Sequence, residues 1–218
     1  YEGLLMSYKN GKIELLNMDC MEYMRTVPDK YFDLAIVDPP YGIDWTGQTK
    51  SVNTGKSWIQ HEVKTWDSKP PEAAYFAELI RVSKNQIIWG ANYFEGMTPT
   101  PCWVIWDKMQ EFSGATFEMA WTSFSSPAKA FRMARCEAYV GTDKIHPTQK
   151  PVKLYQWLLQ NYAKPEFKIL DTHLGSGSSA IAAHYFGVAE FVGTELDEDY
   201  YKACCERFEN ATAQEALF

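Results

Sequence analysis

The stretch FKILDTHLGSGSSAIAAHYFG, residues 167–187, predicts a strand, a glycine-rich turn and a helix in direct succession. The strand, Phe167–Asp171, is mostly apolar, as expected when both faces of a parallel sheet are covered. The turn, residues 172–178, contains two glycines, which let the backbone pass close to a ligand. The helix, residues 179–186, ends at Gly187 in the position of a C-cap. A strand that leads through a tight turn into a helix is typical of parallel α/β sheets.

The same alternation continues on both sides of this unit. The segment EFVGTEL, residues 190–196, predicts a strand, and a final amphipathic helix begins near Asp197. Apolar residues at helical spacing predict a helix from Val152 to Tyr162. We therefore expect an α/β fold in a single domain, residues 1–218, with a mostly parallel sheet flanked by helices. The first forty residues predict a strand, a short helix and a strand: Lys12–Asn17, Cys20–Val27 and Phe32–Val37.

The middle of the chain is less regular. Residues 42–69 are polar with little periodicity, and loops of this length are usually functional or mobile. We expect this segment and residues 125–145 to form two insertions that are mobile or recognise the target. Within the second insertion, residues 128–138 fit a helix or a strand equally well. The regular elements expected between the insertions are a helix and three strands: Glu72–Val82, a strand from Gln86, Trp103–Trp106 and Phe117–Phe124.

The composition limits the classes of protein. The content of 46% hydrophobic and 22% charged residues is typical of a folded globular domain. No apolar run is long enough to predict a membrane span, and the first residues lack the apolar core of a signal peptide. The five cysteines show no CxxC spacing, which fits reduced thiols in the cytoplasm and predicts no metal site. The net charge of −7 argues against a surface coated with basic residues, although local phosphate contacts decide nucleic-acid binding.

The glycine turn is the first group of residues with a chemical meaning. Its glycines allow close approach of the backbone, and the helix start presents free N–H groups. An acid at the end of the next strand, Glu195, can accept hydrogen bonds from ribose hydroxyls, as in nucleotide-binding α/β folds. Together these features predict a nucleoside cofactor. The residues expected to bind it are Asp171, Thr172, Leu174, Gly175, Ser176, Gly177, Ser178, Glu195 and Leu196.

The second group, Asp38-Pro39-Pro40-Tyr41, directly follows the strand Phe32–Val37. Two successive prolines cannot donate ladder hydrogen bonds, so the strand must stop there, and the rings stiffen the backbone. Asp38 can accept a hydrogen bond from an amino group, and the ring of Tyr41 can stack on a planar base. Fixed acceptors of this kind make an amino nitrogen more available for attack on a methyl sulfonium. The four residues are therefore candidates for catalysing amino-group methylation.

These two motifs resemble the amino-methyltransferases that modify adenine or cytosine in DNA. In that family the DPPY motif is catalytic and the glycine turn binds S-adenosylmethionine. In this chain DPPY comes first and the glycine turn comes late, which is the order of the family's β group. A third motif of that group, HPTQKP at residues 146–151, lies between them. The resemblance implies a Rossmann-like methyltransferase fold with a circularly permuted motif order.

The resemblance covers most of the chain, and it departs from the family in one place. A proline and an aromatic residue usually follow the first Asp of the glycine turn, where this chain has Thr172 and His173. We expect His173 to lie beside the cofactor but assign it no stacking role. The parts of the chain that resemble the family are residues 12–41, residues 146–209 and, more loosely, residues 72–124.

The resemblance assigns roles to further residues. The segment with His146, Thr148 and Lys150 holds the methionine end of the cofactor. Its chemistry agrees, because Lys150 can pair with the methionine carboxylate and Thr148 can hydrogen-bond it. Asp19, with Cys20 beside it, faces the adenine of the cofactor and can accept from its amino group. Taken alone, Asp19 equally fits a helix N-cap.

The proposed reaction also implies how DNA is bound. A base inside a duplex cannot bring its amino group to the sulfonium, so the enzyme should flip an adenine out of the helix. Tyr41 would stack on it, and Trp45, Trp66 and Trp89 are candidates for a second platform. The chain has little room for a recognition domain, which predicts a short target site or a homodimer that shares recognition. The residues expected to contact DNA are Trp45, Lys129, Arg132 and Arg135.

Four alternatives remain beside a cytoplasmic, site-specific N6-adenine methyltransferase of a prokaryotic or phage-infected cell. An N4-cytosine enzyme uses the same geometry, although Asp38 favours adenine. A cytosine-C5 enzyme would need a nucleophilic cysteine near a proline, such as Cys102, and would leave DPPY without a role. Methylation of RNA or of a protein amide is disfavoured by the motif order. The intact Asp38 and Tyr41 argue against an inactive cofactor- or DNA-binding subunit.

Overall fold

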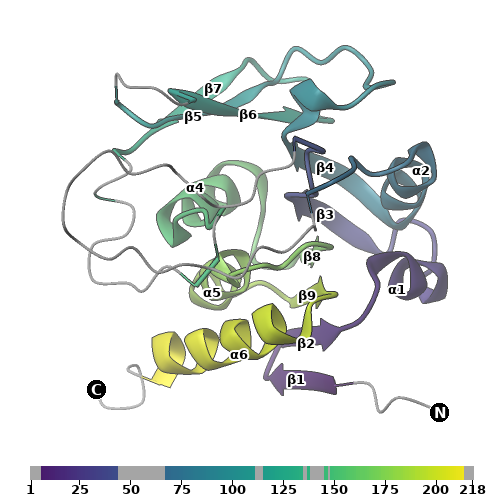
Figure 1. Cartoon of the computed structure of the whole chain (residues 1–218), viewed down its shortest axis with the longest axis vertical. Helices are drawn as coiled ribbons and strands as arrows, with labels where there is room; N and C mark the ends of the chain where they lie inside the picture. Colours follow the sequence, from purple (N-terminus) through teal and green to yellow (C-terminus); the bar gives the residue numbers. More distant parts are fainter. Residues whose placement is uncertain are drawn as a thin grey trace.

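The computed structural model describes residues 6–43, 67–110, 115–134, 137, 145–146 and 148–213. Strands within these residues form one nine-stranded sheet, in the order β1-β2-β9-β8-β3-β4-β6-β5-β7 (Figure 1). The strands are β1 (Met6–Asn10), β2 (Ile13–Asn17), β3 (Phe32–Val37), β4 (Ser83–Trp89), β5 (Val104–Asp107), β6 (Phe117–Thr122), β7 (Lys129–Arg132), β8 (Lys168–Asp171) and β9 (Glu190–Glu195).

The centre of the sheet is parallel. Strands β2, β9, β8, β3 and β4 are neighbours and run in the same direction. At one edge β1 pairs antiparallel with β2, and at the other edge β6 lies antiparallel between β4 and β5. Strand β7 completes this second edge, parallel to β5. The carboxyl ends of the five parallel strands therefore meet at one edge, where ligands bind in open α/β sheets.

Helices cover both faces of the parallel strands (Figure 1). Alternate residues of β3 show why this strand is apolar throughout. Leu34 and Ile36 belong to a core with buried residues of α4, α5 and α6, whereas Ala35 and Val37 belong to a second core with α1 and α2. Both faces are thus removed from water, as in other parallel sheets. The helices are α1 (Cys20–Thr26), α2 (Ala73–Val82), α4 (Val152–Tyr162), α5 (Ser178–Phe186), α6 (Glu198–Ala213) and the short 3₁₀ helix η1 (Ala91–Tyr93).

The structure confirms the predicted α/β class and parallel sheet and refines three elements. Strand β1 is an addition to the prediction, because MSYKN is short, has three exposed residues, and contributes only Met6 and Tyr8 to the core. Strand β4 begins at Ser83 rather than Gln86, and its polar first residues still pair with β3. In the ambiguous segment 128–138, residues Lys129–Arg132 form strand β7. The assignment of residues 42–69 and 125–145 to recognition insertions stays a prediction.

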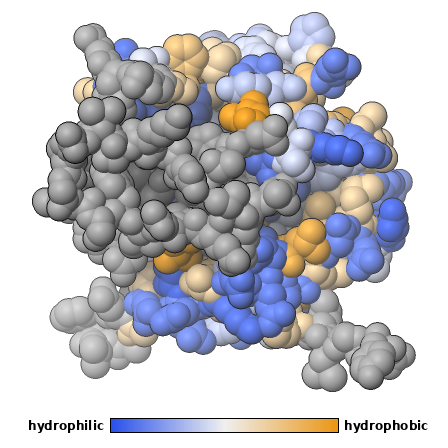
Figure 2. Space-filling model, in the orientation of Figure 1, coloured by the Kyte–Doolittle hydropathy of each residue, from blue (hydrophilic) through white to orange (hydrophobic). Residues whose placement is uncertain are grey.

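The outer surface of the last helix is strongly polar. Figure 2 shows hydrophilic side chains gathered over α6, which carries exposed Glu198, Asp199, Glu206 and Glu209.

In the part of the chain that the structure describes, no helix combines the length and apolar content needed to cross a membrane.

Candidate active site at the carboxyl edge of the sheet

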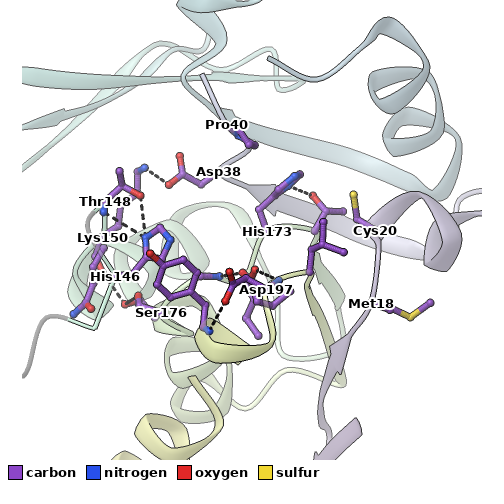
Figure 3. A pocket seen from close by; sticks show the side chains of 18 of the residues that line it. Met18, Cys20, Asp38, Pro40, His146, Thr148, Lys150, His173, Ser176 and Asp197 are labelled. Carbon is purple, nitrogen blue, oxygen red and sulfur yellow. Dashed lines mark hydrogen bonds and ion pairs between the residues drawn. The ribbon is translucent and has the colours of Figure 1, made fainter. Parts of the chain in front are cut away.

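A pocket of about 500 Å³ opens at the carboxyl edge of the parallel strands (Figure 3). Its lining comes from segments at both ends of the sequence. Asp38 and Pro40 follow β3, Asp19 follows β2, and Glu195 ends β9. The DPPY turn and the glycine turn therefore share one cavity. The predicted site residues that line it are Asp19, Cys20, Asp38, Pro40, His146, Thr148, Lys150, Thr172, Leu174, Gly175, Ser176, Ser178, Glu195 and Leu196.

Four residues predicted for catalysis or cofactor binding do not line the pocket. They stand directly behind or beside it. Tyr41 donates its hydroxyl to Asp38, and Asp171 accepts from the backbone N–H of His173. Pro39 and Gly177 lie within the two turns themselves. His173, which was expected to lie beside the cofactor, also lines the pocket. The lining residues to which the sequence assigned no role are Met18, Gln149, Tyr155, Asp197 and Tyr200.

The glycine turn is held by Glu195. The N–H of Gly175 donates to Oε2 of Glu195 at 2.8 Å, and the N–H of Asp197 donates to Oε1 at 2.9 Å. Burial raises the pKa of Glu195, and these two donors oppose that effect. Gly175 and Gly177 have φ angles of +51° and +73°, in the region that favours glycine. At Gly177 a Cβ would also meet Sγ of Cys204 at 2.5 Å, so the turn requires glycine at this position.

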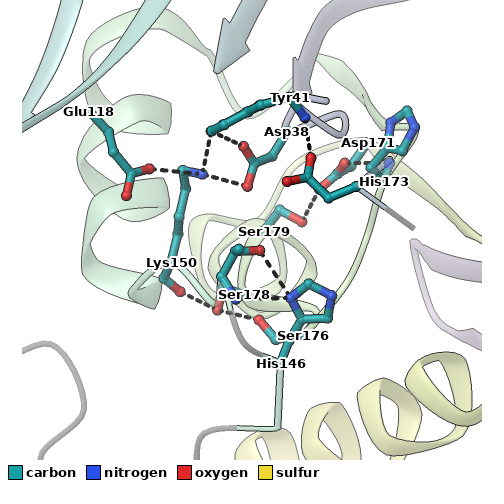
Figure 4. Close-up of polar contacts among 12 residues, drawn as sticks. Asp38, Tyr41, Glu118, His146, Lys150, Asp171, His173, Ser176, Ser178 and Ser179 are labelled. Carbon is teal, nitrogen blue, oxygen red and sulfur yellow. Dashed lines mark hydrogen bonds and ion pairs between the residues drawn. The ribbon is translucent and has the colours of Figure 1, made fainter. Parts of the chain in front are cut away.

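Asp171 is a buried carboxyl beneath the turn (Figure 4). Ser179 donates its hydroxyl to Oδ2 at 2.5 Å, and the N–H of His173 donates to Oδ1 at 3.1 Å. Burial nevertheless raises the pKa of Asp171 to about 7. Asp171 therefore ties the end of β8 to the start of α5 instead of facing the pocket.

The expected adenine end of the pocket contains Asp19, Cys20 and His173. Asp19 caps α1, because its Oδ1 accepts from the N–H groups of Met21 at 2.7 Å and Glu22 at 3.1 Å. The two readings of Asp19 are thus compatible, since it caps the helix and also lines the cavity. Burial lowers the pKa of His173 to about 4, so the imidazole is neutral near pH 7. Burial raises the pKa of Cys20 to about 12, so this thiol is not a nucleophile.

The DPPY turn is fixed by a residue far from it in sequence. Oδ1 of Asp67 accepts from the N–H groups of Tyr41 at 2.7 Å and Gly42 at 3.0 Å. The Tyr41 hydroxyl donates to Oδ1 of Asp38 at 2.7 Å. Gly90, which follows β4 with a φ of +71°, leaves room for the Tyr41 ring, because a Cβ there would lie 2.0 Å from a ring carbon. The contacts of Asp67 with the turn and the space left by Gly90 after β4 therefore orient Asp38 and Tyr41.

Aromatic rings surround Tyr41 in a way that the sequence did not predict. The ring of Tyr93 lies nearly parallel to that of Tyr41, with centroids 5.2 Å apart, and is 48% exposed. Trp89 is wrong as a second stacking platform, because it is completely buried in the core. The other two candidates, Trp45 and Trp66, lie outside the described residues.

Four charged side chains form a chain at the back of the site, and Figure 4 shows three of them, Asp38, Lys150 and Glu118. The Lys150 ammonium, whose side chain is 2% exposed, forms an ion pair with Oδ2 of Asp38 and another with Oε2 of Glu118 at 3.2 Å. Lys108 pairs with Oε1 of Glu118 at 2.6 Å. Burial raises the pKa of Asp38, against the opposite effect of Lys150. The two lysines lower the pKa of Glu118 to about 2, against the effect of its burial. The ammonium of Lys150 thus faces the DPPY turn.

His146 and Thr148 of the HPTQKP segment lie across the pocket from Cys20 (Figure 3). Thr148 and His146 contact one another through Oγ1 and Nδ1 at 3.1 Å, and the His146 ring packs against Tyr200 with centroids 4.4 Å apart. The segment is joined to the glycine turn, because the Ser178 hydroxyl donates to the Lys150 carbonyl at 2.7 Å. The HPTQKP segment and the start of α5 therefore form one wall of the cavity.

The two predicted DNA contacts that the structure describes, Lys129 and Arg132, do not line this pocket. Lys129 and Arg132 stand on the edge strand β7. Lys129 donates to Oδ1 of Asn161 at 2.8 Å, and Arg132 pairs with Asp107 at 3.4 Å with its side chain 73% exposed. Arg135 and Trp45 lie outside the described residues, so the DNA-binding set stays a prediction.

Besides the unassigned lining residues, three residues that hold the site from outside the pocket were not predicted: Asp67, Tyr93 and Glu118. A carboxylate in the apolar strand FEMAWT is a signal that could have pointed to Glu118, since a half-buried acid needs a partner. Asp67 and Tyr93 had no such signal, because each acts on a turn that is distant in sequence. Cys102, the thiol considered for C5 chemistry, is fully buried beside Ser126 and Tyr162.

The chain is similar to known DNA methylases. A family model of N6/N4 methyltransferases, described as "DNA methylase", matches residues 59–206, more than half of the chain. The protein named "Putative methylase YubD" of Escherichia coli (strain K12) is 27% identical over 209 residues, which cover 91% of this chain and 90% of that protein.

Two solved methyltransferase structures share the fold. The PvuII DNA methyltransferase, described as cytosine-N4-specific, aligns with a TM-score of 0.62 at 14% identity and covers 94% of this chain and 92% of that chain. The M1.HpyAVI–SAM complex aligns with a TM-score of 0.57, also at 14% identity, and covers 90% of this chain and 98% of that chain. At this level of identity the likeness concerns the fold alone.

Proposed function

Because the chain belongs to the N6/N4 DNA methylase family, we propose that it transfers a methyl group from S-adenosylmethionine to an exocyclic amino group in DNA, with N6 of adenine as the target. One observation carries the proposal. Asp38 of the DPPY turn and Glu195 behind the glycine turn line the same cavity, although they come from opposite ends of the chain. A methyl donor bound by the glycine turn and Glu195 would therefore lie beside a base whose amino group is held by Asp38. The description of M1.HpyAVI as a SAM complex supports this choice of cofactor.

The lining of the pocket fits S-adenosylmethionine chemically. Asp19 receives both helix-cap hydrogen bonds on Oδ1, so its other oxygen can accept from the cofactor's adenine amino group. A carboxylate has about four acceptor positions, so Glu195 can accept from ribose hydroxyls beyond its two backbone donors. Thr148 and the start of α5 provide donors for the methionine end. The cavity volume of about 500 Å³ lies in the range of small-molecule sites.

Asp38 has the chemistry to hold the acceptor amino group. When bound, the cofactor would supply a methyl group: the nitrogen–carbon bond would form as the carbon–sulfur bond breaks, the sulfur would leave as a neutral thioether, and the nitrogen would give up a proton to solvent. Asp38 accepts an N–H of the base and so directs the nitrogen lone pair towards the methyl group. Pro39 and Pro40 keep this acceptor in place because their φ angles are fixed. The transfer is direct and uses no thiol nucleophile, in agreement with the burial of Cys102.

The target base must leave the duplex to reach this pocket. We expect the flipped base to approach Tyr41 from the side where Tyr93 now lies, 5.2 Å away between ring centroids. Tyr93 is 48% exposed, so its ring can move aside or cover the base. DNA would follow the edge strand β7 with Lys129 and Arg132, and a homodimer could share recognition.

Cytosine N4 is the second candidate target. The fold is shared with the PvuII enzyme, which is described as cytosine-N4-specific, and the same acceptor geometry serves either amino group. Asp38 at the first motif position favours adenine through the family resemblance. We therefore keep adenine as the proposal and cytosine as the alternative.

A labelled methyl-transfer assay tests the proposal. DNA is incubated with the protein and with S-adenosylmethionine labelled on the methyl group, and its nucleosides are then separated. Label in N6-methyl-2′-deoxyadenosine is expected, and label in N4-methyl-2′-deoxycytidine would establish the alternative. Asp38→Ala should abolish transfer while changing cofactor affinity by no more than about twofold. A wild-type protein that binds the cofactor and transfers no label to DNA would instead be an inactive subunit.

A further inference from the structure

All three N–H groups of the Lys150 ammonium have hydrogen-bond partners at the back of the site. An ammonium has three N–H donors and no acceptor. In the structure the Nζ atom contacts Oδ2 of Asp38, Oε2 of Glu118 at 3.2 Å and the Tyr41 hydroxyl at 3.3 Å. Its fourth neighbour is the face of the Trp89 ring, 5.2 Å from Nζ to the centroid. No donor is left over for a cofactor carboxylate.

The charges around Lys150 also balance without a ligand. Asp38 and Glu118 carry two negative charges, and Lys150 and Lys108 carry two positive ones. The side chains are largely buried, with exposed fractions between 2% and 23%. Partly buried ions are costly unless they are paired, so this alternating set is stable as it stands. A methionine carboxylate beside Lys150 would add a third negative charge to a set that is already neutral.

We propose that Lys150 and Glu118 are positioning residues for Asp38, and that the methionine carboxylate of the cofactor is bound by another part of the pocket. This inference rests on the proposed function, because it assigns Asp38 the role of amino-group acceptor. Lys150 holds one oxygen of Asp38 and Tyr41 holds the other. Two donors on opposite oxygens fix the plane of the carboxylate. Glu118, itself held by Lys108, keeps the ammonium in place.

The proposal reverses the role that the family resemblance gives to Lys150. Its backbone carbonyl still joins the wall of the cofactor site through Ser178, whereas its side chain crosses to the DPPY turn. The HPTQKP segment thus connects the two halves of the site. Glu118 comes from β6, an antiparallel strand next to β4, so the region outside the parallel core contributes to catalysis through Lys150.

A binding experiment separates the two roles of Lys150. Calorimetry compares S-adenosylhomocysteine, which keeps the amino-acid carboxylate, with 5′-methylthioadenosine, which lacks it. The variant is Lys150→Met combined with Glu118→Gln, because the remaining charges of Asp38 and Lys108 still balance. We expect the ratio of the two affinities to stay within about twofold of the wild-type ratio. A selective loss of S-adenosylhomocysteine affinity of about tenfold or more would overturn the proposal. Binding of methylthioadenosine also reports that the variant is folded.

A kinetic experiment tests the positioning role. Glu118→Gln should lower kcat for methyl transfer by about 10- to 100-fold, with both KM values within about twofold, since a small misplacement of a catalytic group has effects of this size. Glu118→Asp should recover part of the loss, because it restores the charge. Glu14→Gln, which removes the acid of the exposed Lys9–Glu14 pair, is the control and should keep wild-type rates.

Two results would contradict the positioning role. One is a kcat of Glu118→Gln within about twofold of wild type, and the other is a loss confined to the KM for the cofactor. A wild-type protein without transfer to DNA would contradict the proposed function instead. In that case the calorimetric comparison would still decide whether Lys150 serves the cofactor carboxylate.

Discussion

The backbone N–H of Gly175 donates to Oε2 of Glu195 at 2.8 Å, so the acid at the end of β9 holds the glycine turn after β8. The second oxygen of Glu195 accepts from the N–H of Asp197 at 2.9 Å. One carboxylate therefore shapes the turn and faces the pocket at the same time. In the proposed enzyme, the Glu195 carboxylate therefore links the position of the cofactor's ribose to that of the glycine turn.

Glu195→Gln should weaken cofactor binding. The amide nitrogen of glutamine cannot accept from either Gly175 or Asp197, so one backbone donor loses its partner whichever way the amide is turned. Loss of a hydrogen bond to a charged group corresponds to roughly a 10- to 100-fold rise in the Kd for S-adenosylmethionine. Calorimetry measures the Kd for S-adenosylmethionine. The control is Glu190→Gln, at the other end of the same strand. An unchanged Kd would show that Glu195 has no part in binding.

Gly90→Ala should disturb the catalytic turn. A Cβ at this position would lie 2.0 Å from a carbon of the Tyr41 ring, so the ring must move away from its place beside Asp38. Gly96→Ala is a matched control, because Gly96 has a φ of +77° against +71° at Gly90 and a Cβ there meets nothing within 4 Å. Both variants carry the backbone strain of about 1 kcal/mol. Only Gly90→Ala should lose methyl transfer by about tenfold or more. Equal rates for the two variants would exclude a role for the Tyr41 position.

Asp171 should make the stability of the protein depend on pH. Its pKa is raised to about 7 by burial, from an ordinary value of 3.8. The folded protein therefore binds a proton more tightly than the unfolded chain, and this stabilising contribution is lost as the pH rises from about 4 through about 7. Relative to Asp171→Asn, which does not titrate, the wild type should lose on the order of 1 kcal/mol of unfolding free energy per pH unit in that window. Urea unfolding at pH 5, 6, 7 and 8 measures the difference. A difference that is constant between pH 5 and 7 would contradict the raised pKa.

The local patterns of the sequence were sufficient to predict the strands of the parallel core and the positions of the two motifs. The strand before DPPY and the strand–turn–helix at residues 167–187 each contain their own start and stop signals, so strand ends and the two motifs could be placed. The parallel order of these strands then brings Asp38 and Glu195 to one edge. The meeting of the two motifs thus follows from topology and could be predicted from the sequence.

The contacts that cross between distant elements could not be predicted. Glu118 reaches Lys150 only because β6 inserts between β4 and β5, an arrangement that no local pattern in FEMAWT determines. The same holds for Asp67, which binds the backbone of Tyr41 and Gly42. Strand β1 was missed for another reason, because its alternation contains only two apolar residues, Met6 and Tyr8, which is too short a pattern to mark a strand.

The basic residues near β7 should provide phosphate contacts. Arg132 has a side chain that is 73% exposed on the edge strand, Lys129 stands on the same strand, and Arg135 lies outside the described residues. Each phosphate contact contributes about 0.9 to the slope of log K against log salt. Replacing all three residues by alanine should therefore weaken DNA binding and reduce this slope by roughly 2 to 3.

The measurement for β7 is a salt titration of DNA affinity, combined with calorimetry of cofactor binding. Cofactor affinity should not change, because Lys129 and Arg132 lie outside the residues that line the pocket. Lys202→Ala is the control, since this exposed lysine stands on the acidic helix α6 and pairs with Glu198. An acidic surface repels phosphate, so loss of Lys202 should leave the slope unchanged. If the triple variant kept the wild-type slope, DNA would have to approach the DPPY turn along another surface.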